Sequence, residues 1–294
     1  MKFSIIVKSL RIPFLVLTPV CIFLGYSLAS NIQINPSFHN IILVLLGSLF
    51  AHISVNTFNE YFDFKSGLDL RTNRTAFSGG SGALPENPEM AKTIFWVAII
   101  SLVVAIVFGI YLLLQGLFLL IPIGLVGSLI IVTYTQWINR RAILCLVSPG
   151  LGFGLLMVLG SFYALSGEMF SGAWLVFLVP FFLVNNLLLL NQYPDIEPDK
   201  TVGRQTFPIV FGVKLSNLVY AIFTILAYLV IGSLIVIEVL PLSSSVAFLP
   251  IVLSVYAFSG AIKHGSKIGQ EPSYLASNVG ATILTPLFLG LSIL

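Results

Sequence analysis

Charged residues are scarce in this sequence: Asp, Glu, Lys and Arg make up only 9% of its 294 residues, whereas 57% are hydrophobic. With a mean hydropathy of +1.04, the chain has too little polar surface for a soluble globular protein of this length. The two cysteines, Cys21 and Cys145, lie in or beside apolar runs, which argues against a disulfide framework or a cysteine metal site. Tracts of Lys and Arg are also missing, so we expect no nucleic-acid partner.

Long apolar runs dominate the sequence instead. Runs of about 18–23 residues suit α-helices that cross a hydrocarbon layer about 30 Å thick, whereas a β-barrel would show short alternating segments. The first run has no clear A-x-A cleavage site, which favours a membrane span over a signal peptide. The sequence therefore predicts an all-α integral membrane protein, a bundle of nine transmembrane helices. The predicted spans cover residues 12–30, 40–60, 93–112, 116–135, 143–165, 172–192, 215–237, 243–262 and 274–294.

The basic residues all fall on one side of this map. The 14 Lys and Arg precede the first span or lie in alternate connections, whereas the opposite connections carry only Glu168 and Glu238 as charges. The positive-inside rule then predicts a cytoplasmic N-terminus and a C-terminus outside, as an odd number of spans requires. The two longest connections, after the second and sixth spans, lie on this cytoplasmic side, and their length favours a function for both.

The two long connections begin with the same pattern. NEYFD at 59–63 and NQYPD at 191–195 both read Asn-x-Tyr-x-Asp at the end of a span, and each continues to another acid, Asp69 or Asp199. Oxygen ligands without His or Cys favour a hard cation, and Mg²⁺ normally bridges a few carboxylates to substrate phosphates. Four spans separate the two copies, so both face the same side. We expect two half-sites around one central cavity that opens to the cytoplasm.

Neighbouring side chains complete the predicted site. Asn59 and Asp63 are four residues apart and share a face of a helix, and Asn191 and Asp195 repeat this spacing, although Pro194 indicates that the second helix ends or kinks there. The predicted metal ligands are Asp63, Asp69, Asp195 and Asp199, and these acids together with Asn59 are the predicted catalytic residues. The side chains expected to bind a diphosphate are Lys65, Arg71, Arg74, Lys200 and Arg204. Candidates for contact with an acceptor or a cationic intermediate are Tyr61, Tyr193, Asn186 and Asn191.

These motifs resemble those of the UbiA superfamily of intramembrane prenyltransferases, over nearly the whole chain. The residues that match its two Asp-rich motifs are Asn59, Asp63, Asp69, Asp195 and Asp199. The resemblance implies a single domain over residues 1–294, embedded in the lipid bilayer. It also implies an enzyme that uses Mg²⁺ to transfer a polyprenyl group from a polyprenyl diphosphate to a small, usually aromatic, acceptor.

Within that superfamily the sequence resembles most closely the 1,4-dihydroxy-2-naphthoate polyprenyltransferases of menaquinone biosynthesis. It departs from their pattern at Glu60, where they have Asp, and at Pro194, where they have Arg. A Gly-Pro-x-Pro-Leu stretch expected after the fourth span is replaced by YTQWINRRAIL, close to the acceptor region. Other acceptors stay open: 4-hydroxybenzoate, homogentisate, a haem or chlorophyll precursor, or a glycerol-phosphate lipid. A membrane transporter is the alternative of another class, but it would place ionisable groups deep in the spans, where this chain has almost none.

Overall fold

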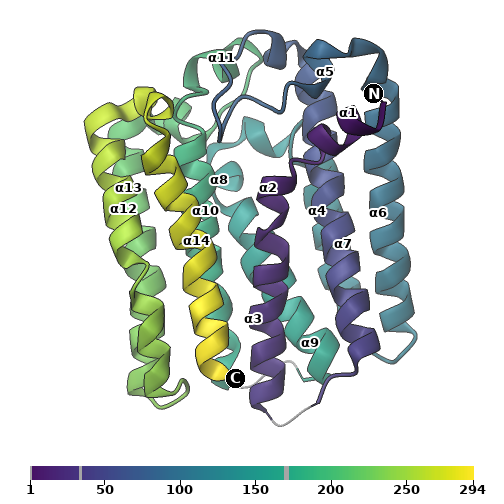
Figure 1. Cartoon of the computed structure of the whole chain (residues 1–294), viewed down its shortest axis with the longest axis vertical. Helices are drawn as coiled ribbons and strands as arrows, with labels where there is room; N and C mark the ends of the chain where they lie inside the picture. Colours follow the sequence, from purple (N-terminus) through teal and green to yellow (C-terminus); the bar gives the residue numbers. More distant parts are fainter. Residues whose placement is uncertain (1, 33–34, 169–171) are drawn as a thin grey trace.

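Helices form the whole framework of the described chain. The computed structural model describes residues 2–32, 35–168 and 172–294. Long helices run side by side in one bundle, and the short elements α1 (Lys2–Ser9), α5 (Ala83–Glu86) and α11 (Ile196–Thr201) gather at one end of it (Figure 1). The last helix, α14 (Pro272–Ile293), finishes at the opposite end from α1 (Figure 1). The two ends of the chain therefore lie at opposite ends of the bundle.

Eight segments of the described chain are long and apolar enough to cross a membrane. They are Ile12–Asn31, Phe38–Ser66, Pro88–Leu113, Ala142–Ser166, Trp174–Asn191, Phe207–Val236, Leu242–Gln270 and Pro272–Ile293, and each coincides with a predicted span. The remaining prediction, 116–135, falls on α7 (Leu120–Thr133), which has only 14 residues. At 1.5 Å per residue α7 is about 21 Å long, shorter than a hydrocarbon layer of about 30 Å. A turn at 114–119 takes up the first residues of that prediction, so nine full-length spans are not confirmed.

The long segments pack in a few extended pairs. Their component helices are α2 (Ile12–Leu15), α3 (Leu17–Asn31), α4 (Phe38–Ser66), α6 (Ala91–Leu113), α8 (Ala142–Gly150), the π-helical stretch η4 (Leu151–Leu159), α9 (Gly160–Ser166), α10 (Leu178–Asn191), α12 (Phe207–Val236) and α13 (Ile251–His264). The most extensive contacts join α4 to α6, α10 to α12, and α14 to both α3 and α13. Small residues allow close approach where η4 meets α10, because a Cβ at Gly154 would lie 2.6 Å from the backbone nitrogen of Phe181.

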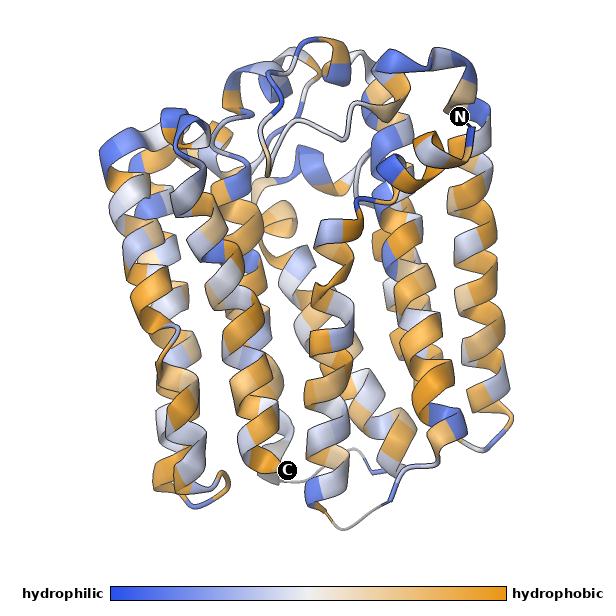
Figure 2. Cartoon of the chain, in the orientation of Figure 1, coloured by the Kyte–Doolittle hydropathy of each residue, from blue (hydrophilic) through white to orange (hydrophobic). Residues whose placement is uncertain are grey.

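Polar residues concentrate at the end of the bundle that carries α1, α5 and α11, whereas the long helices are mostly hydrophobic (Figure 2). Large apolar side chains such as Ile100, Leu125 and Val252 are exposed on the helix surfaces. Exposed aliphatic groups on long apolar helices are stable in contact with lipid rather than water. The hydropathy pattern and the packing therefore agree on a membrane-embedded bundle with one polar end.

Two helix ends at the polar end position the acidic motifs. Helix α4 ends at Ser66 because Gly67 adopts a left-handed conformation (φ 77°, ψ 7°). Asp69 then lies in a short 3₁₀ turn, η1 (Leu68–Leu70). Helix α10 ends at Asn191, three residues before Pro194, which confirms the predicted helix end there.

Candidate active site

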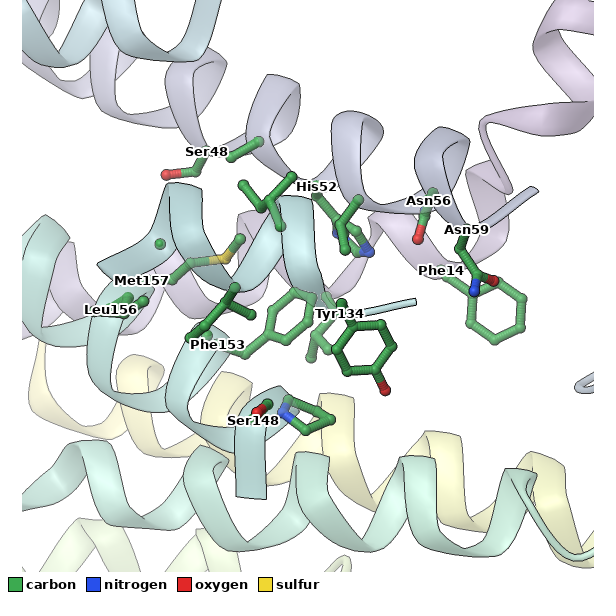
Figure 3. A pocket seen from close by; sticks show the side chains of 18 of the residues that line it. Phe14, Ser48, His52, Asn56, Asn59, Tyr134, Ser148, Phe153, Leu156 and Met157 are labelled. Atoms are coloured by element: carbon green, nitrogen blue, oxygen red, sulfur yellow. The ribbon is translucent and has the colours of Figure 1, made fainter. Parts of the chain in front are cut away.

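One cavity of about 650 Å³ joins the polar end of the bundle to its interior. Its lining follows α4 from Leu43 to Asp63, a distance of about 30 Å along a helix axis, and includes parts of α6, α7 and η4. Figure 3 shows side chains of α4 facing those of α8 and η4 across this cavity. The labelled residues include Ser48, His52, Asn56 and Asn59 from α4, and Ser148, Phe153, Leu156 and Met157 from the facing side. The cavity is thus polar at one end and largely apolar along its body.

The four predicted acids all line this cavity. Asp63 comes from the last turns of α4 and Asp69 from η1, whereas Asp195 and Asp199 come from the turn before α11 and from α11 itself. The side chain of Arg204 forms ion pairs with both Asp63 and Asp199. Folding therefore brings the two sequence motifs to one place. Asp195 lies in a turn beyond the end of α10, so the helical spacing from Asn191 does not position it.

Several oxygens near the acids lack a hydrogen-bond partner although they are buried. These atoms include Asp69 Oδ2, Asp195 Oδ1 and Asn191 Oδ1. Buried, unpaired oxygen atoms are costly, and they are the ligands that a hard cation prefers. Within the described residues, however, no group of three or more His, Cys, Asp and Glu side chains lies close enough together to hold a metal ion. The donor atoms therefore fit Mg²⁺, and gathering them onto one ion requires the side chains to move.

Burial makes these carboxyl groups hold their protons more tightly. Burial, reinforced by the charge of Asp63, raises the pKa of Asp69 to about 8. Burial, reinforced by the charge of Asp199, raises the pKa of Asp195 to about 7. The pKa of Asp199 is raised by burial to about 6, with Arg204 opposing the rise. A cation bound among these groups would favour their ionised forms and reverse this effect.

A buried ion pair beside the acids joins three separate segments. Arg11, which lies just before α2, places its Nε 2.7 Å and its Nη2 2.6 Å from Glu60 Oε1. The Glu60 side chain has no exposed surface, and it accepts hydrogen bonds from the Ser81 backbone N–H (2.8 Å) and hydroxyl (2.7 Å). Arg11 adopts a left-handed backbone conformation (φ 54°), which is unusual for a non-glycine residue. In the sequence, Glu60 stands out only as a departure from the family pattern, and no local signal predicts its pairing with Arg11.

The glycine-rich stretch 78–82 lies against both acidic motifs. The Gly79 N–H donates a hydrogen bond to Asp195 Oδ2 at 3.2 Å. Gly80 has φ 75°, and a Cβ there would lie 2.7 Å from Asp69 Oδ1. A side chain at position 80 would therefore be strained and would displace the carboxylate of Asp69. The loop positions acids from both halves of the chain.

Only part of the predicted basic set reaches the cavity. Of the five side chains expected to bind diphosphate, Arg204 lines it, and Arg11 joins it from outside the predicted set. The other four side chains do not line the cavity. Arg71 is exposed, and the Lys65 ammonium lies 5.9 Å from the centre of the Tyr61 ring. The remaining two form ion pairs elsewhere, Arg74 with Glu86 (3.1 Å) and Lys200 with Glu197 (2.7 Å). Lys65 follows Asp63 by two residues, which places it on the opposite face of α4.

The predicted aromatic and amide contacts also divide. Asn59 and Asn191 line the cavity, but Tyr61, Tyr193 and Asn186 do not. The Tyr61 ring packs against that of Phe95, with the ring centroids 4.8 Å apart. Tyr193 is fully buried, and its hydroxyl lies 2.7 Å from Asn217 Oδ1. Asn186 Nδ2 donates a hydrogen bond to the Tyr220 carbonyl at 2.9 Å. These three residues hold helices together in this structure.

Two further polar residues, Tyr134 and His52, line the cavity. Tyr134 belongs to the stretch YTQWINRRAIL that departs from the expected pattern, and its ring faces the cavity near Phe153 (Figure 3). His52 Nδ1 lies 2.8 Å from Thr18 Oγ1. The position of His52 on α4 gives a usable signal, because it lies seven residues, or about two turns, before Asn59 and therefore on the same face.

Comparison with known proteins agrees with this architecture. Residues 18–278 match the UbiA prenyltransferase family. The chain is 30% identical to a 1,4-dihydroxy-2-naphthoate octaprenyltransferase of Bacillus subtilis (strain 168) over 250 residues, which cover 84% of this chain and 77% of that protein.

Two solved structures have the same fold at low sequence identity. One, from work on digeranylgeranylglyceryl phosphate synthase, has a TM-score of 0.64 at 17% identity and covers 98% of each chain. The other is a UbiA homologue from Archaeoglobus fulgidus bound to DMAPP and Mg²⁺, with a TM-score of 0.60 at 18% identity, covering 94% of this chain and 99% of that one.

Proposed function

Because the chain belongs to the UbiA prenyltransferase family, we propose that this prenyltransferase transfers a polyprenyl group from a polyprenyl diphosphate to 1,4-dihydroxy-2-naphthoate. The observation that carries the proposal is a cavity with both acidic motifs at its polar end and apolar side chains along its body. The Bacillus subtilis naphthoate octaprenyltransferase supports the choice of acceptor. The whole chain, residues 1–294, acts as one domain in this proposal.

Mg²⁺ would be held by Asp63, Asp69, Asp195 and Asp199, which offer carboxylate oxygens at the polar end. When bound, the ion stabilises the negative charge that develops on the leaving diphosphate. The guanidinium groups of Arg11 and Arg204 line the same end and are suited to bind phosphate oxygens through paired N–H groups. Asn59, on the face of α4 that also carries Asp63, orients groups at this end through its amide.

The apolar body of the cavity serves the other half of the reaction. Departure of diphosphate leaves an allylic cation, which water would quench, so a lining of Val44, Phe108 and Leu156 helps by excluding water. The Tyr134 and Phe14 rings line the cavity beside its polar residues and offer faces that attract a cation. The electron-rich acceptor ring forms the new carbon–carbon bond and then loses a proton. The length of the cavity along α4 suits a long prenyl chain.

The orientation in the membrane follows from charge. On the predicted map of spans, all 14 Lys and Arg precede the first span or lie in connections on the side that carries the acidic motifs. We infer that this side is cytoplasmic, with the C-terminus outside. A cytoplasmic opening lets the diphosphate enter from water while the prenyl chain enters the apolar body of the cavity.

A direct assay tests the proposed function. Membranes that contain the protein are incubated with Mg²⁺, labelled polyprenyl diphosphate and 1,4-dihydroxy-2-naphthoate, and the lipid-soluble product is identified by mass. We expect a prenylated product of 1,4-dihydroxy-2-naphthoate that EDTA abolishes and that the Asp63→Ala variant does not form; its mass shows whether the ring lost a proton or CO₂. A product formed only with a glycerol-phosphate lipid or 4-hydroxybenzoate would refute the acceptor and keep the reaction class. Full activity in EDTA would refute the role of the metal.

A further inference from the structure

Arg204 connects the two acidic motifs directly. Its Nη1 lies 2.9 Å from Asp199 Oδ1, and its Nη2 forms an ion pair with Asp63 Oδ1. The Arg204 side chain is 14% exposed, and those of Asp63 and Asp199 are 8% and 3% exposed. Three largely buried charges therefore depend on one another, because a buried charge without a partner is strongly destabilising.

Backbone hydrogen bonds hold the main chain at Arg204 independently of its side chain. The Arg204 N–H donates to the Asp199 carbonyl at 3.2 Å, and the Gln205 N–H donates to the Asn139 carbonyl at 2.9 Å. The preceding residue, Gly203, takes a left-handed turn with φ 78°. A long side chain on a fixed backbone can change its partner by rotation about its own bonds.

The oxygens that Arg204 occupies belong to the same acids that would hold the cation. In the other two acids, the oxygens Asp69 Oδ2 and Asp195 Oδ1 are buried without a hydrogen-bond partner. Arg204 pairs with the Oδ1 atom of both Asp63 and Asp199. A divalent cation that draws on all four acids would therefore bind beside this positive charge, and the repulsion between the two favours release of the guanidinium from Asp63 and Asp199. Once released, the guanidinium stays at the cavity and needs another anion, and a diphosphate fits its paired N–H groups.

We propose that Arg204 is a positioning residue that competes with the divalent cation for Asp63 and Asp199 and moves to the diphosphate when the cation binds. This inference rests on the proposed function, because it takes the four acids as the cation site. Its consequence is that cation and diphosphate bind cooperatively, each favouring the arrangement that the other needs. Arg204 thus keeps the two halves of the site together and also couples its two ligands.

Binding of Mn²⁺ to the purified full-length protein, followed by the electron paramagnetic resonance signal of free Mn²⁺, tests this competition without any turnover. Mn²⁺ takes oxygen ligands as Mg²⁺ does. Without diphosphate, R204Q is expected to bind Mn²⁺ about tenfold more tightly than the unaltered protein, equivalent to about 1.4 kcal/mol. Inorganic diphosphate should strengthen Mn²⁺ binding by the unaltered protein, and this enhancement should shrink in R204Q.

R141Q is the matched control. Unlike Arg204, Arg141 is exposed; its guanidinium lies 3.8 Å from the centre of the Trp137 ring, and no ion pair joins it to a carboxylate among the described residues. R141Q removes the same charge and should leave Mn²⁺ affinity unchanged. Should R204Q fail to fold, R204K keeps the charge but cannot span both acids, and it should bind Mn²⁺ about threefold more tightly.

Each other outcome has a definite meaning. Equal Mn²⁺ affinity in R204Q and the unaltered protein would refute the competition. Weaker binding in R204Q would show that Arg204 only supports the site, and would also refute it. If the unaltered protein binds no Mn²⁺ with or without diphosphate, the proposed metal site itself fails.

Discussion

Replacing Glu60 with glutamine should destabilise this protein more than the same substitution at an exposed glutamate. The Glu60 side chain is fully buried and accepts hydrogen bonds from Arg11 and from both the backbone and hydroxyl of Ser81. Glutamine keeps the size of the side chain but removes its charge and turns one acceptor oxygen into an N–H donor. The substitution leaves the Arg11 guanidinium, whose side chain is 22% exposed, without its ion-pair partner.

The expected loss of stability follows from the burial of this pair. Removing one partner of a buried ion pair costs about 3–5 kcal/mol, and the partial exposure of Arg11 favours about 3 kcal/mol. At roughly 2–4 °C per kcal/mol, the unfolding midpoint Tm should fall by about 6–12 °C. The backbone of the 78–82 loop should also loosen, because Ser81 loses two bonds to a carboxylate.

Thermal unfolding in detergent micelles, followed by tryptophan fluorescence, measures this change. Glu86→Gln is the matched control, because Glu86 pairs with Lys8 and Arg74 at the same end of the bundle but is 53% exposed. Exposed pairs contribute little to stability, so Glu86→Gln should leave Tm nearly unchanged. Equal Tm values for Glu60→Gln and the unaltered protein would refute the reasoning.

Three further predictions concern the site. Asp63→Ala and Asp195→Ala should each abolish turnover yet leave the protein in the membrane, which product assays and carbonate extraction can measure; normal turnover in either variant would exclude these acids as essential ligands. The Mg²⁺ concentration for half-maximal activity should rise at least about tenfold between pH 8 and pH 6, because protons increasingly occupy Asp69 (pKa about 8) and Asp195 (pKa about 7) as the pH falls; a flat dependence over this range would contradict the raised pKa values. Gly124→Phe should slow transfer of long prenyl chains more than of short ones, because Gly124 lines the cavity and a Cβ there has no atom within 4 Å; equal slowing for donors of every length would argue against this path.

Local sequence signals predicted much of the architecture because they reflect local physics. Helix type and position follow from apolar runs that must satisfy their own backbone hydrogen bonds in lipid. The position of Pro194 predicted a helix end correctly. The predicted span 116–135 was longer than α7, because an apolar turn and an apolar helix look alike in hydropathy.

Site residues on helices could be predicted from spacing, whereas those in turns and loops could not. Asn59 and Asp63 are four residues apart on one helix, and both line the cavity as the spacing predicts. The same periodicity places Tyr61 and Lys65, each two residues from Asp63, on the opposite face, and it could have removed them from the predicted cavity. For residues in turns and loops no such rule exists, so the sequence alone could not separate Arg204 from Lys200.

By itself, the sequence determined that this chain is a helical membrane protein, and it predicted that the basic residues and the two acidic motifs share one side. Composition and periodicity act residue by residue along the chain, and they are enough for those features. Tertiary structure decided which charged and polar groups meet. Arg204 pairs with Asp63 across 141 residues and Arg11 with Glu60 across 49, and the Gly79 N–H reaches Asp195 across 116. Such pairs form because the packing of distant helices buries charges that need partners, and no local pattern specifies which partner each will find.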